Sequence, residues 1–488
     1  MSGSVSRRSF LKYTGMAGAA VCGLGLAGTA PAVSDNDAEE GVPMVHKKSG
    51  WAGTSAEPKK ASSLYKRIRL ELDKIPMVDM HEHLWPPHML AERKLIDATY
   101  LLSTYAGIDL MTAGMPGNDM VEIRNIESKW SLERRWEAVR PWYKKTWNTA
   151  FCEPVRIAVR DIYGVDDITD ETFAYITERM RATPKDTWIR TMFDKAGIAI
   201  AMLDNTQGSP VFPRTRYPDI FVDDMHDFFT YVDKGRVDML SNESEISVNN
   251  LGGFLHIIDW YFDKFADEAN AFKIIRAYHR TLDVDNVPRA DADKLYARFL
   301  KGETLAPNEI KAVEDFLIRY SIRAAGQHNL PVKIHTGIPV ITGQISRFLS
   351  VVRENPNVMF DIYHIGWPYA EELVAMAKFE RNIWADFCWS WIMNPVSTRR
   401  YLSEMLECVP LTKIHGFGGD YNYVEESYAH AMIAKREITQ VLTEKVETGR
   451  FTEDYAIEIA HAILRDNAME HFRIKEKLDL YRLRGVKR

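Results

Sequence analysis

Two histidines separated by one residue, His81 and His83, stand at the end of an apolar run that begins at Ile75. In an extended strand, the side chains of residues i and i+2 point to the same face. Both imidazole rings can therefore bind one cation from the end of a single strand. Two histidines at this spacing also occur by chance in core strands, so the interpretation needs support from elsewhere in the chain.

Three more residues of metal-ligand type supply that support, because each lies at the C-terminal end of an apolar, strand-like run of its own. They are His335, His364 and Asp420. Four such coincidences are unlikely in one chain, and we interpret the set as a metal site. His415 lies five residues before Asp420 in the same run, which makes it too deep in the strand to be a first-choice ligand.

The composition is that of a globular protein with a large core. Of the 488 residues, 46% are hydrophobic and 27% are charged. The formal net charge of -6 gives no basic footprint for DNA or RNA, so nucleic-acid binding is not expected. The cysteines are too few and too scattered for a disulfide framework or a thiolate zinc site, and we expect nitrogen and oxygen to hold any metal: Cys22, Cys152, Cys388 and Cys408.

The N-terminus resembles a twin-arginine export signal. The segment 6–12 carries the two arginines, and a mild apolar segment rich in Gly and Ala follows over 14–29. Small residues before the predicted cleavage site at Ala32 make residues 1–32 the signal peptide. The twin-arginine export machinery would then deliver the folded protein to the periplasm or the extracellular space. The alternatives are an uncleaved membrane anchor and a lipoprotein signal at Cys22.

The next stretch leads from a linker into the folded domain, residues 64–488. Residues 33–63 are polar and lack apolar periodicity, which predicts a flexible linker. A short helix over 64–72 precedes the first strand. Residues 84–195 then have helical patterns and five tryptophans, and this insertion either packs on itself or covers the metal as a lid. Those tryptophans are Trp130, Trp136, Trp142, Trp147 and Trp188.

Beyond the insertion, strand-like and helix-like segments alternate. Eight strand candidates separated by helices predict a TIM-type (β/α)8 barrel, in which the active site lies at the C-terminal ends of the strands. The candidates are the segment from residue 75 and the segments 199–204, 220–222, 271–278, 332–335, 358–363, 383–387 and 413–417. The expected helices are 251–270, 308–328, 343–354, 370–379 and 398–408, and the region 428–488 also has a helical pattern.

This ligand pattern resembles that of the amidohydrolase superfamily of metal-dependent hydrolases, over about residues 75–472. The nearer likeness is to the amidohydrolase-related ("amidohydrolase 2") branch and the amidohydrolase domains related to glutamine synthetase, and it is carried by the segments 272–278, 334–337 and 419–421. Two departures are visible. The segment 278–282 shifts an expected arginine by one position and lacks a glycine, and Gly419 stands where relatives often have serine.

The resemblance implies roles for the ligand set. His81, His83, His335 and Asp420 would hold one divalent ion, with zinc as first choice, and leave one position for water. The ion lowers the pKa of that water from about 15.7 toward roughly 7, and Asp420 would take its proton. His364 would either polarise the scissile carbonyl or complete a second metal position.

Two basic residues are less tightly specified. Lys273 lies on the fourth strand candidate, where a carboxylated lysine bridges two metals in binuclear relatives, but substrate binding or an ion pair at the core edge would also explain it. Arg280 follows the same strand and is a candidate for substrate binding.

The function we expect is hydrolysis of a C–N or C–O bond in a small molecule, such as an amide, cyclic amide, lactone or ester, with metal-bound water as the nucleophile. The alternative on the same barrel is a metal-dependent non-oxidative decarboxylase, because a fold does not fix the reaction. A binding protein that has kept the metal but lost the chemistry is the third hypothesis, and the intact ligand set argues against it. A homo-oligomer is compatible with the sequence.

Overall fold

The computed structural model describes residues 61–84, 96–125, 127–184, 187–204, 211–212, 220–337 and 341–483. The predicted signal peptide and nearly all of the predicted linker lie outside these residues. No helix within the described ranges is both long and apolar enough to cross a membrane.

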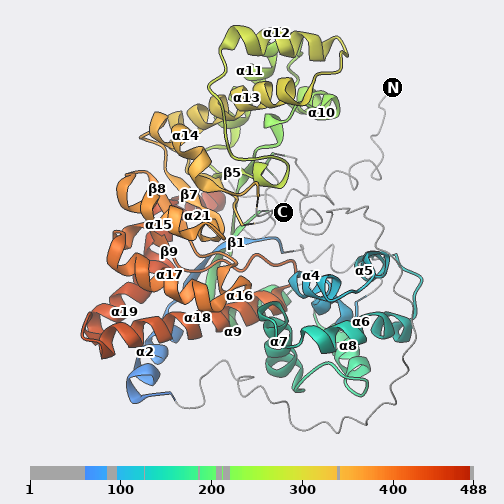
Figure 1. Ribbon diagram of the computed structural model, residues 1–488, viewed down its shortest axis with the longest axis vertical. Coiled ribbons are helices and arrows are strands. Elements are labelled where there is room, and N and C mark those ends of the chain that lie inside the picture. Colours follow the sequence, from blue (N-terminus) through green and yellow to red (C-terminus); the bar gives the residue numbers. More distant parts are fainter. Residues whose placement is uncertain are drawn as a thin grey trace.

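Short parallel strands form the centre of the molecule, and helices surround them (Figure 1). Every hydrogen-bonded neighbour pair is parallel, in a three-stranded sheet of order β1-β2-β3 and a six-stranded sheet of order β4 to β9. The strands are β1 (Met77–Glu82), β2 (Ile198–Leu203), β3 (Phe221–Asp223), β4 (Met225–His226), β5 (Phe272–Ile274), β6 (Val332–Ile334), β7 (Phe360–Ile362), β8 (Ile383–Asp386) and β9 (Ile414–His415).

Backbone hydrogen bonds connect the two sheets on both sides. Only Asp224 separates β3 from β4, so these two strands occupy one position of the eight that the sequence predicts. On the other side, the Met80 amide donates to the Phe417 carbonyl at 3.0 Å, and the Asp420 amide donates to the His81 carbonyl at 2.8 Å. The first strand thus lies beside the segment after the last one. The predicted α/β class with a parallel strand arrangement is confirmed.

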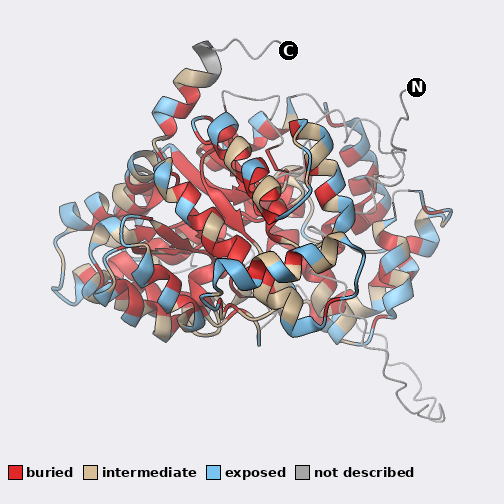
Figure 2. Cartoon of the chain, turned by 90° about the horizontal axis from the view of Figure 1, so that it is seen from above, coloured by how far each residue is buried: buried red, intermediate tan, exposed pale blue. Residues whose placement is uncertain are grey.

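The helices cover the outside of the strands, and Figure 2 shows the buried strands surrounded by helices whose outer faces are exposed. Helix α2 precedes β1, and α18 packs against it and against α7 and α9. The helices of this layer are α2 (Ser63–Lys74), α10 (Lys234–Ser244), α11 (Leu251–Phe265), α12 (Arg289–Leu300), α13 (Pro307–Gln327), α14 (Leu349–Glu354), α15 (Ala370–Phe379), α16 (Ser390–Met393), α17 (Pro395–Cys408), α18 (Val424–Glu447), α19 (Glu453–His461), α20 (Asn467–His471) and α21 (Ile474–Leu483).

Between β1 and β2, the regular elements among the described residues are helices, and α4 to α8 gather at one side of the strands (Figure 1). They are α4 (Tyr105–Thr112), α5 (Gly117–Arg124), α6 (Leu132–Thr146), α7 (Glu153–Tyr163), α8 (Phe173–Ala182) and α9 (Trp188–Ala196). Helices α4 to α8 share a core of their own, in which Trp136 stacks on Phe173 at 5.2 Å between ring centroids, whereas α9 packs on the barrel. Tyr105 and Phe151 lie instead against Trp389 of the barrel, at 5.2 and 5.7 Å. The insertion therefore both packs on itself and contacts the barrel near the predicted site.

Several strands are shorter than the sequence predicts, and hydrogen bonds explain the early ends of two of them. The predicted strand 271–278 ends at Ile274, because the Ile275 amide donates to the Asp227 carboxylate at 3.3 Å and the chain turns into a short 3-10 helix. The predicted strand 413–417 ends at His415, because the Gly416 amide donates to the carbonyl of Ile463 at 2.7 Å. Apolar character alone does not reveal such competing partners.

The interior of the barrel contains an ion pair as well as apolar side chains. Lys333 Nζ lies 2.8 and 3.0 Å from the two carboxylate oxygens of Asp224, and neither residue is exposed. Burial of a charge is costly unless it is paired, so each partner depends on the other. Phe472, between α20 and α21, lies under this pair, with its ring centroid 5.1 Å from Lys333 Nζ.

Replacement of one partner tests that dependence. We expect Lys333→Met to lower the free energy of unfolding by about 3 kcal/mol, because Asp224 is left buried without its partner, and Lys333→Met/Asp224→Asn to recover part of the loss. Denaturant unfolding measures both. Lys234→Met, which breaks an exposed pair with Asp238, is the control and should change stability by less than about 1 kcal/mol. An equally small loss in Lys333→Met would contradict the prediction.

Candidate metal centre

Three histidines converge on the carboxylate of Asp420 at the C-terminal ends of the strands. His81 Nε2 lies 3.4 Å and His83 Nε2 lies 3.2 Å from Oδ1 of Asp420, and His364 Nε2 lies 3.8 Å from its Oδ2. The rings come from β1, from the residue just beyond it, and from the turn after β7, while Asp420 follows β9. The tertiary structure therefore brings together residues that are up to 339 positions apart in the chain.

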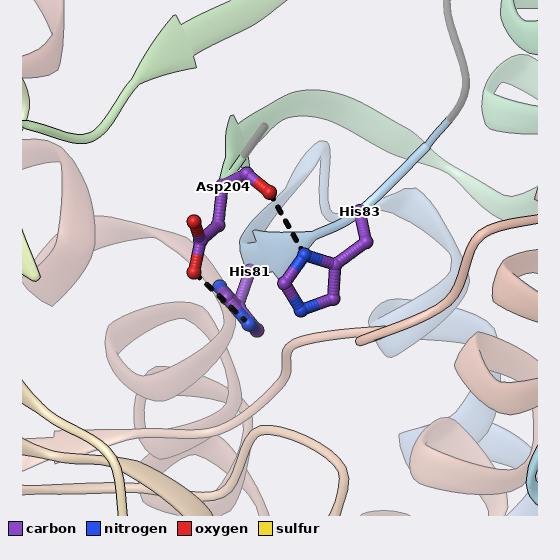
Figure 3. A group of neighbouring side chains, drawn as sticks. All are labelled: His81, His83 and Asp204. Carbon is purple, nitrogen blue, oxygen red and sulfur yellow. Dashed lines mark hydrogen bonds and ion pairs between the residues drawn. The ribbon is translucent and has the colours of Figure 1, made fainter. Parts of the chain in front are cut away.

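Asp204, just after β2, is a member of this cluster that our sequence interpretation missed (Figure 3). Its carbonyl accepts a hydrogen bond from His83 Nδ1 at 2.8 Å, and its carboxylate lies 3.9 Å from His81 Nε2 and 3.0 Å from His226 Nδ1. Asp204 ends the predicted strand 199–204, the same relative position as the predicted ligands, and that was the available signal. His226 lies on a strand of two residues, which leaves no signal in the sequence.

His335 joins the cluster through His364. Nδ1 of His335 lies 3.1 Å from Nε2 of His364, and the second nitrogen of His364, Nδ1, lies 3.1 Å from the carbonyl oxygen of Cys388. A carbonyl only accepts, so His364 Nδ1 carries the proton. Burial lowers the pKa of His364 to about 4, against the opposing charge of Asp420, so the ring is neutral at pH 7. Nε2 then has a lone pair, which suits a ligand or acceptor and not a donor to a scissile carbonyl.

The thiol of Cys388 also lies near the cluster, with its Sγ within 4.8 Å of ligand atoms of His364 and Asp420. Burial raises the pKa of this thiol well above its usual range, and the nearby charge of Asp420 adds to the effect. The thiolate is the form that binds metals. The structure thus favours nitrogen and oxygen as ligands, as the sequence suggested, even though a sulfur atom is close.

The two basic residues singled out in the sequence lie in different environments. Lys273 on β5 is buried, and its Nζ lies 3.4 Å from the ring centroid of Tyr363, with no hydrogen-bond acceptor among the described residues. Burial lowers its pKa. Arg280 instead faces α13, where its guanidinium pairs with Asp315. The structure does not bring Arg280 to the histidines, and its charge is already matched.

The backbone is strained where it presents these groups. His364 has φ 62°, Trp389 has φ 62° and Asp420 has φ 60°, and all three values lie in the left-handed region that favours glycine. Such residues persist where the surroundings over-determine them, and they occur preferentially at functional sites. In this chain they follow β7, β8 and β9, on the side of the barrel where a TIM-type active site is expected.

Charges set the protonation of the ligands. Burial raises the pKa of Asp420, but the neighbouring His81 and His83 outweigh it and hold that pKa well below its usual range, so the carboxylate is ionised. Burial and the charge of Lys273 lower the pKa of His81. Burial also lowers the pKa of His83, but the hydrogen bond to Asp420 and the charge of Asp204 raise it to about 9.

A pair of buried acids ties β1 to the turn that carries Asp420. Asp79 Oδ1 accepts from the Gly419 amide at 2.9 Å, and Glu82 Oε2 accepts from the Tyr421 amide at 2.9 Å. Burial raises the pKa of both acids, to about 7 for Asp79, and this favours one shared proton. A Cβ at Gly419 would lie 1.9 Å from Glu82 Oε1. The absence of a side chain at position 419 therefore accommodates Glu82.

This donor set fits a divalent ion. Imidazole nitrogens and a carboxylate oxygen converge from separate strands, and imidazole ligands suit zinc as well as iron, copper and nickel. His81 Nδ1 is buried without a hydrogen-bond partner in the described part of the chain. His83 Nδ1 donates to a backbone carbonyl, which orients the ring and leaves Nε2 for a metal.

Gly419→Ala tests the clamp formed by the two acids. The new methyl group would collide with Glu82, so we expect a loss of roughly 1–3 kcal/mol in the free energy of unfolding and weaker metal binding, because Asp420 shifts with the turn. Denaturant unfolding and a metal titration measure the two effects. Gly117→Ala, whose Cβ would meet nothing within 4 Å, is the control. Equal unfolding midpoints for the two variants would show that the turn is not clamped.

The pKa of His83 predicts how metal affinity depends on pH. A metal must displace the His83 proton below about pH 9, whereas Asp420 is already ionised and His81 and His364 are already neutral. We therefore expect the affinity to increase about tenfold per pH unit between pH 7 and 8.5. Competition with a chelator of known pH dependence measures this slope. In His83→Asn the slope should largely disappear, and an unchanged slope would assign the proton to another group.

Comparisons with known proteins agree with this fold. Residues 268–474 match the family described as Amidohydrolase. Over 233 residues, the chain is 26% identical to Protein fluG of Emericella nidulans, an alignment that covers 44% of this chain. It covers only 27% of fluG, so the chain spans about a quarter of the length of that relative.

Solved structures with little sequence identity share the arrangement. A uronate isomerase from Thermotoga maritima has a TM-score of 0.68 at 14% identity, over 84% of this chain and 98% of its own. A glucuronate isomerase from Caulobacter crescentus has a TM-score of 0.68 at 14% identity, over 86% of this chain and 96% of its own. A Lactobacillus casei protein, whose description as a metal-dependent hydrolase is provisional, has a TM-score of 0.57 at 14% identity. The match covers 84% of this chain and 98% of its own. At these identities the likeness shows the fold alone.

Proposed function

We propose that this chain, whose residues 268–474 match the Amidohydrolase family, is a metal-dependent hydrolase of a C–N or C–O bond in a small molecule. The family and the barrel support an enzyme with a metal centre. Among the solved structures of similar fold are isomerases, so the type of reaction rests on the site and not on the fold.

One observation carries the proposal. The ionised carboxylate of Asp420 lies within 3.2 to 3.8 Å of Nε2 atoms of three histidines, at the end of the barrel where strand ends present catalytic groups. An ionised carboxylate beside a metal is the group that a hydrolase needs to accept a proton from water.

We assign the metal to His81, His83, His335 and Asp420, with His364 as a further ligand candidate and zinc as the first choice. A bound divalent ion would lower the pKa of a water molecule toward roughly 7 and so supply hydroxide at neutral pH. A second ion near Lys273 would require carboxylation of its amine, and the depressed pKa of Lys273 makes the neutral amine more available for it.

The side chains of the centre have separate roles in the proposed reaction. Asp420 accepts the proton of the attacking water and returns it to the leaving group, because it is ionised and central. His364 holds a lone pair toward the site and orients His335. The contacts of Tyr105 and Phe151 with Trp389 place the insertion beside the centre, where it would exclude bulk water.

The cellular context of this proposal comes from the N-terminal sequence. We propose export by the twin-arginine route with the metal already bound, a small-molecule substrate and a periplasmic or extracellular site of action. These expectations rest on residues 1–32, which lie outside the described part of the chain.

Metal content and isotope incorporation test the proposal together. We expect at least one divalent ion per purified chain, its loss in His81→Ala, and a fall in kcat of about 10²- to 10⁴-fold in Asp420→Asn when the two proteins are compared at equal metal occupancy. A screen of small amides, lactones and esters in ¹⁸O-labelled water should yield products that carry one ¹⁸O atom and keep every carbon.

The control is His256→Ala, an exposed histidine of α11, which should leave metal content and turnover unchanged. Release of carbon dioxide would show that the reaction is a decarboxylation and not a hydrolysis. An isomeric product without ¹⁸O would show that it is an isomerisation. Absence of metal after reconstitution would overturn the mechanism.

A further inference from the structure

A second cluster of ligand-type side chains lies deeper in the barrel than the centre described above. Asp361 on β7, Asp386 on β8 and His415 on β9 come from three adjacent strands, and Asp386 and His415 are direct partners in the sheet register. One ligand atom of each lies within 4.8 Å of the others. Asp361 precedes His364 by three residues and His415 precedes Asp420 by five, so the cluster lies below the candidate metal centre, and Asp386 and His415 are the last residues of their strands.

The two carboxylates of this cluster are not fully satisfied. All three residues are completely buried. Asp386 Oδ1 accepts from the Cys388 amide at 2.7 Å, and Asp361 Oδ1 lies 2.9 Å from His415 Nδ1. The other oxygen of each carboxylate, Oδ2, is buried and has no hydrogen-bond partner within the described residues. Since the interior of a TIM barrel is normally filled by branched apolar side chains, two such oxygens there call for a ligand.

The nearest buried cation does not balance these charges. Lys333 is bound to both carboxylate oxygens of Asp224, so its charge is already matched. The imidazole of His415 pairs with Asp361 and can offset one carboxylate at most, and an unbalanced buried carboxylate is expensive in a medium of low dielectric constant. Either protons or a bound cation must neutralise Asp361 and Asp386.

The histidine is supported in the way that metal-binding histidines usually are. His415 uses both ring nitrogens, because Nε2 lies 3.1 Å from Nδ1 of the half-buried His471 while Nδ1 faces Asp361. An ionised carboxylate only accepts, so His415 Nδ1 donates to Asp361 Oδ1, and a bound cation would take the place of that proton. With the cation bound, His415 Nε2–H would donate to His471, and such an outer partner is the usual companion of a histidine ligand.

We propose that Asp361, Asp386 and His415 form a second cation site, separate from the candidate metal centre, which holds a divalent transition ion such as Zn²⁺ or Mn²⁺ inside the barrel. Two carboxylate oxygens and one imidazole nitrogen suit these ions. Because ligand distances are about 2.0–2.2 Å, the three atoms would move closer together when the ion binds. The ion would neutralise the buried carboxylates and tie β7, β8 and β9 together, a structural role beyond the proposed hydrolysis.

Metal analysis of the full chain tests this site. Protein refolded or purified in the presence of Zn²⁺ and dialysed against metal-free buffer should contain one equivalent more than Asp386→Asn. His81→Ala should lose metal independently, and the combined variant should lose both contributions. Because the metal lost from each site is measured separately, this result can be interpreted even if the proposed catalytic centre proves wrong.

His471→Ala is the second variant, since it keeps all three ligands and removes only the outer partner of His415. We expect it to fold and to weaken the site about 10- to 100-fold in a titration with Mn²⁺ followed by electron paramagnetic resonance. His279→Ala, which replaces an exposed histidine after β5, is the matched control. Equal metal content in the parent and Asp386→Asn, or an unchanged Mn²⁺ titration in His471→Ala, would overturn the proposal and assign the neutralisation of the carboxylates to protons.

Discussion

The hydrogen bonds between the first strand and the turn after the last strand are the interaction on which the rest of this structure depends. The Asp420 amide donates to the His81 carbonyl at 2.8 Å, and the His83 amide donates to the Tyr421 carbonyl at 3.1 Å. The same bonds join the edges of the two sheets and set Asp420 opposite both histidines. Closure of the strand ring and assembly of the centre are therefore one event. This coupling explains why two buried acids, Asp79 and Glu82, are kept at the junction.

This arrangement buries several charged side chains, and different partners balance them at different depths in the barrel. At the C-terminal ends of the strands, Asp420 is balanced by the surrounding imidazoles and, when bound, by a metal. In the middle, Asp224 is balanced by Lys333. Each polar group in the interior needs a named partner, because an unpaired one would cost as much as a large share of the stability of a domain. The interior thus specifies its own geometry more strictly than an apolar core of the same volume.

The helical insertion connects this centre to the rest of the molecule. Its own core makes it a stable body, and Tyr105 and Phe151 extend from it to stack near Trp389. The ring of Trp389 in turn lies 5.2 Å from that of His364. A contiguous set of aromatic rings therefore runs from the insertion to a residue of the centre. In a barrel with short strands, such a cover supplies the shape that the strand ends alone do not provide.

The sequence by itself determined the class of fold and the alternation of strands and helices, and it singled out His81, His83, His335, His364 and Asp420 as candidate residues of the site. It could do so because strand periodicity and residue type are local properties, and because each ligand ends an apolar run. Arg280 shows the limit of this reasoning, since it also follows a strand but is bound to α13.

Only the tertiary structure decided which groups meet. Asp204 and His226 join the centre because β2 and β4 lie beside β1 and β5, and a strand of two residues has no recognisable periodicity. The early ends of β5 and β9 follow from hydrogen bonds to Asp227 and Ile463, which are remote in sequence. The protonation of His83 and His364 likewise depends on burial and on neighbours from other strands, so these properties are set by the folded barrel and not by local sequence.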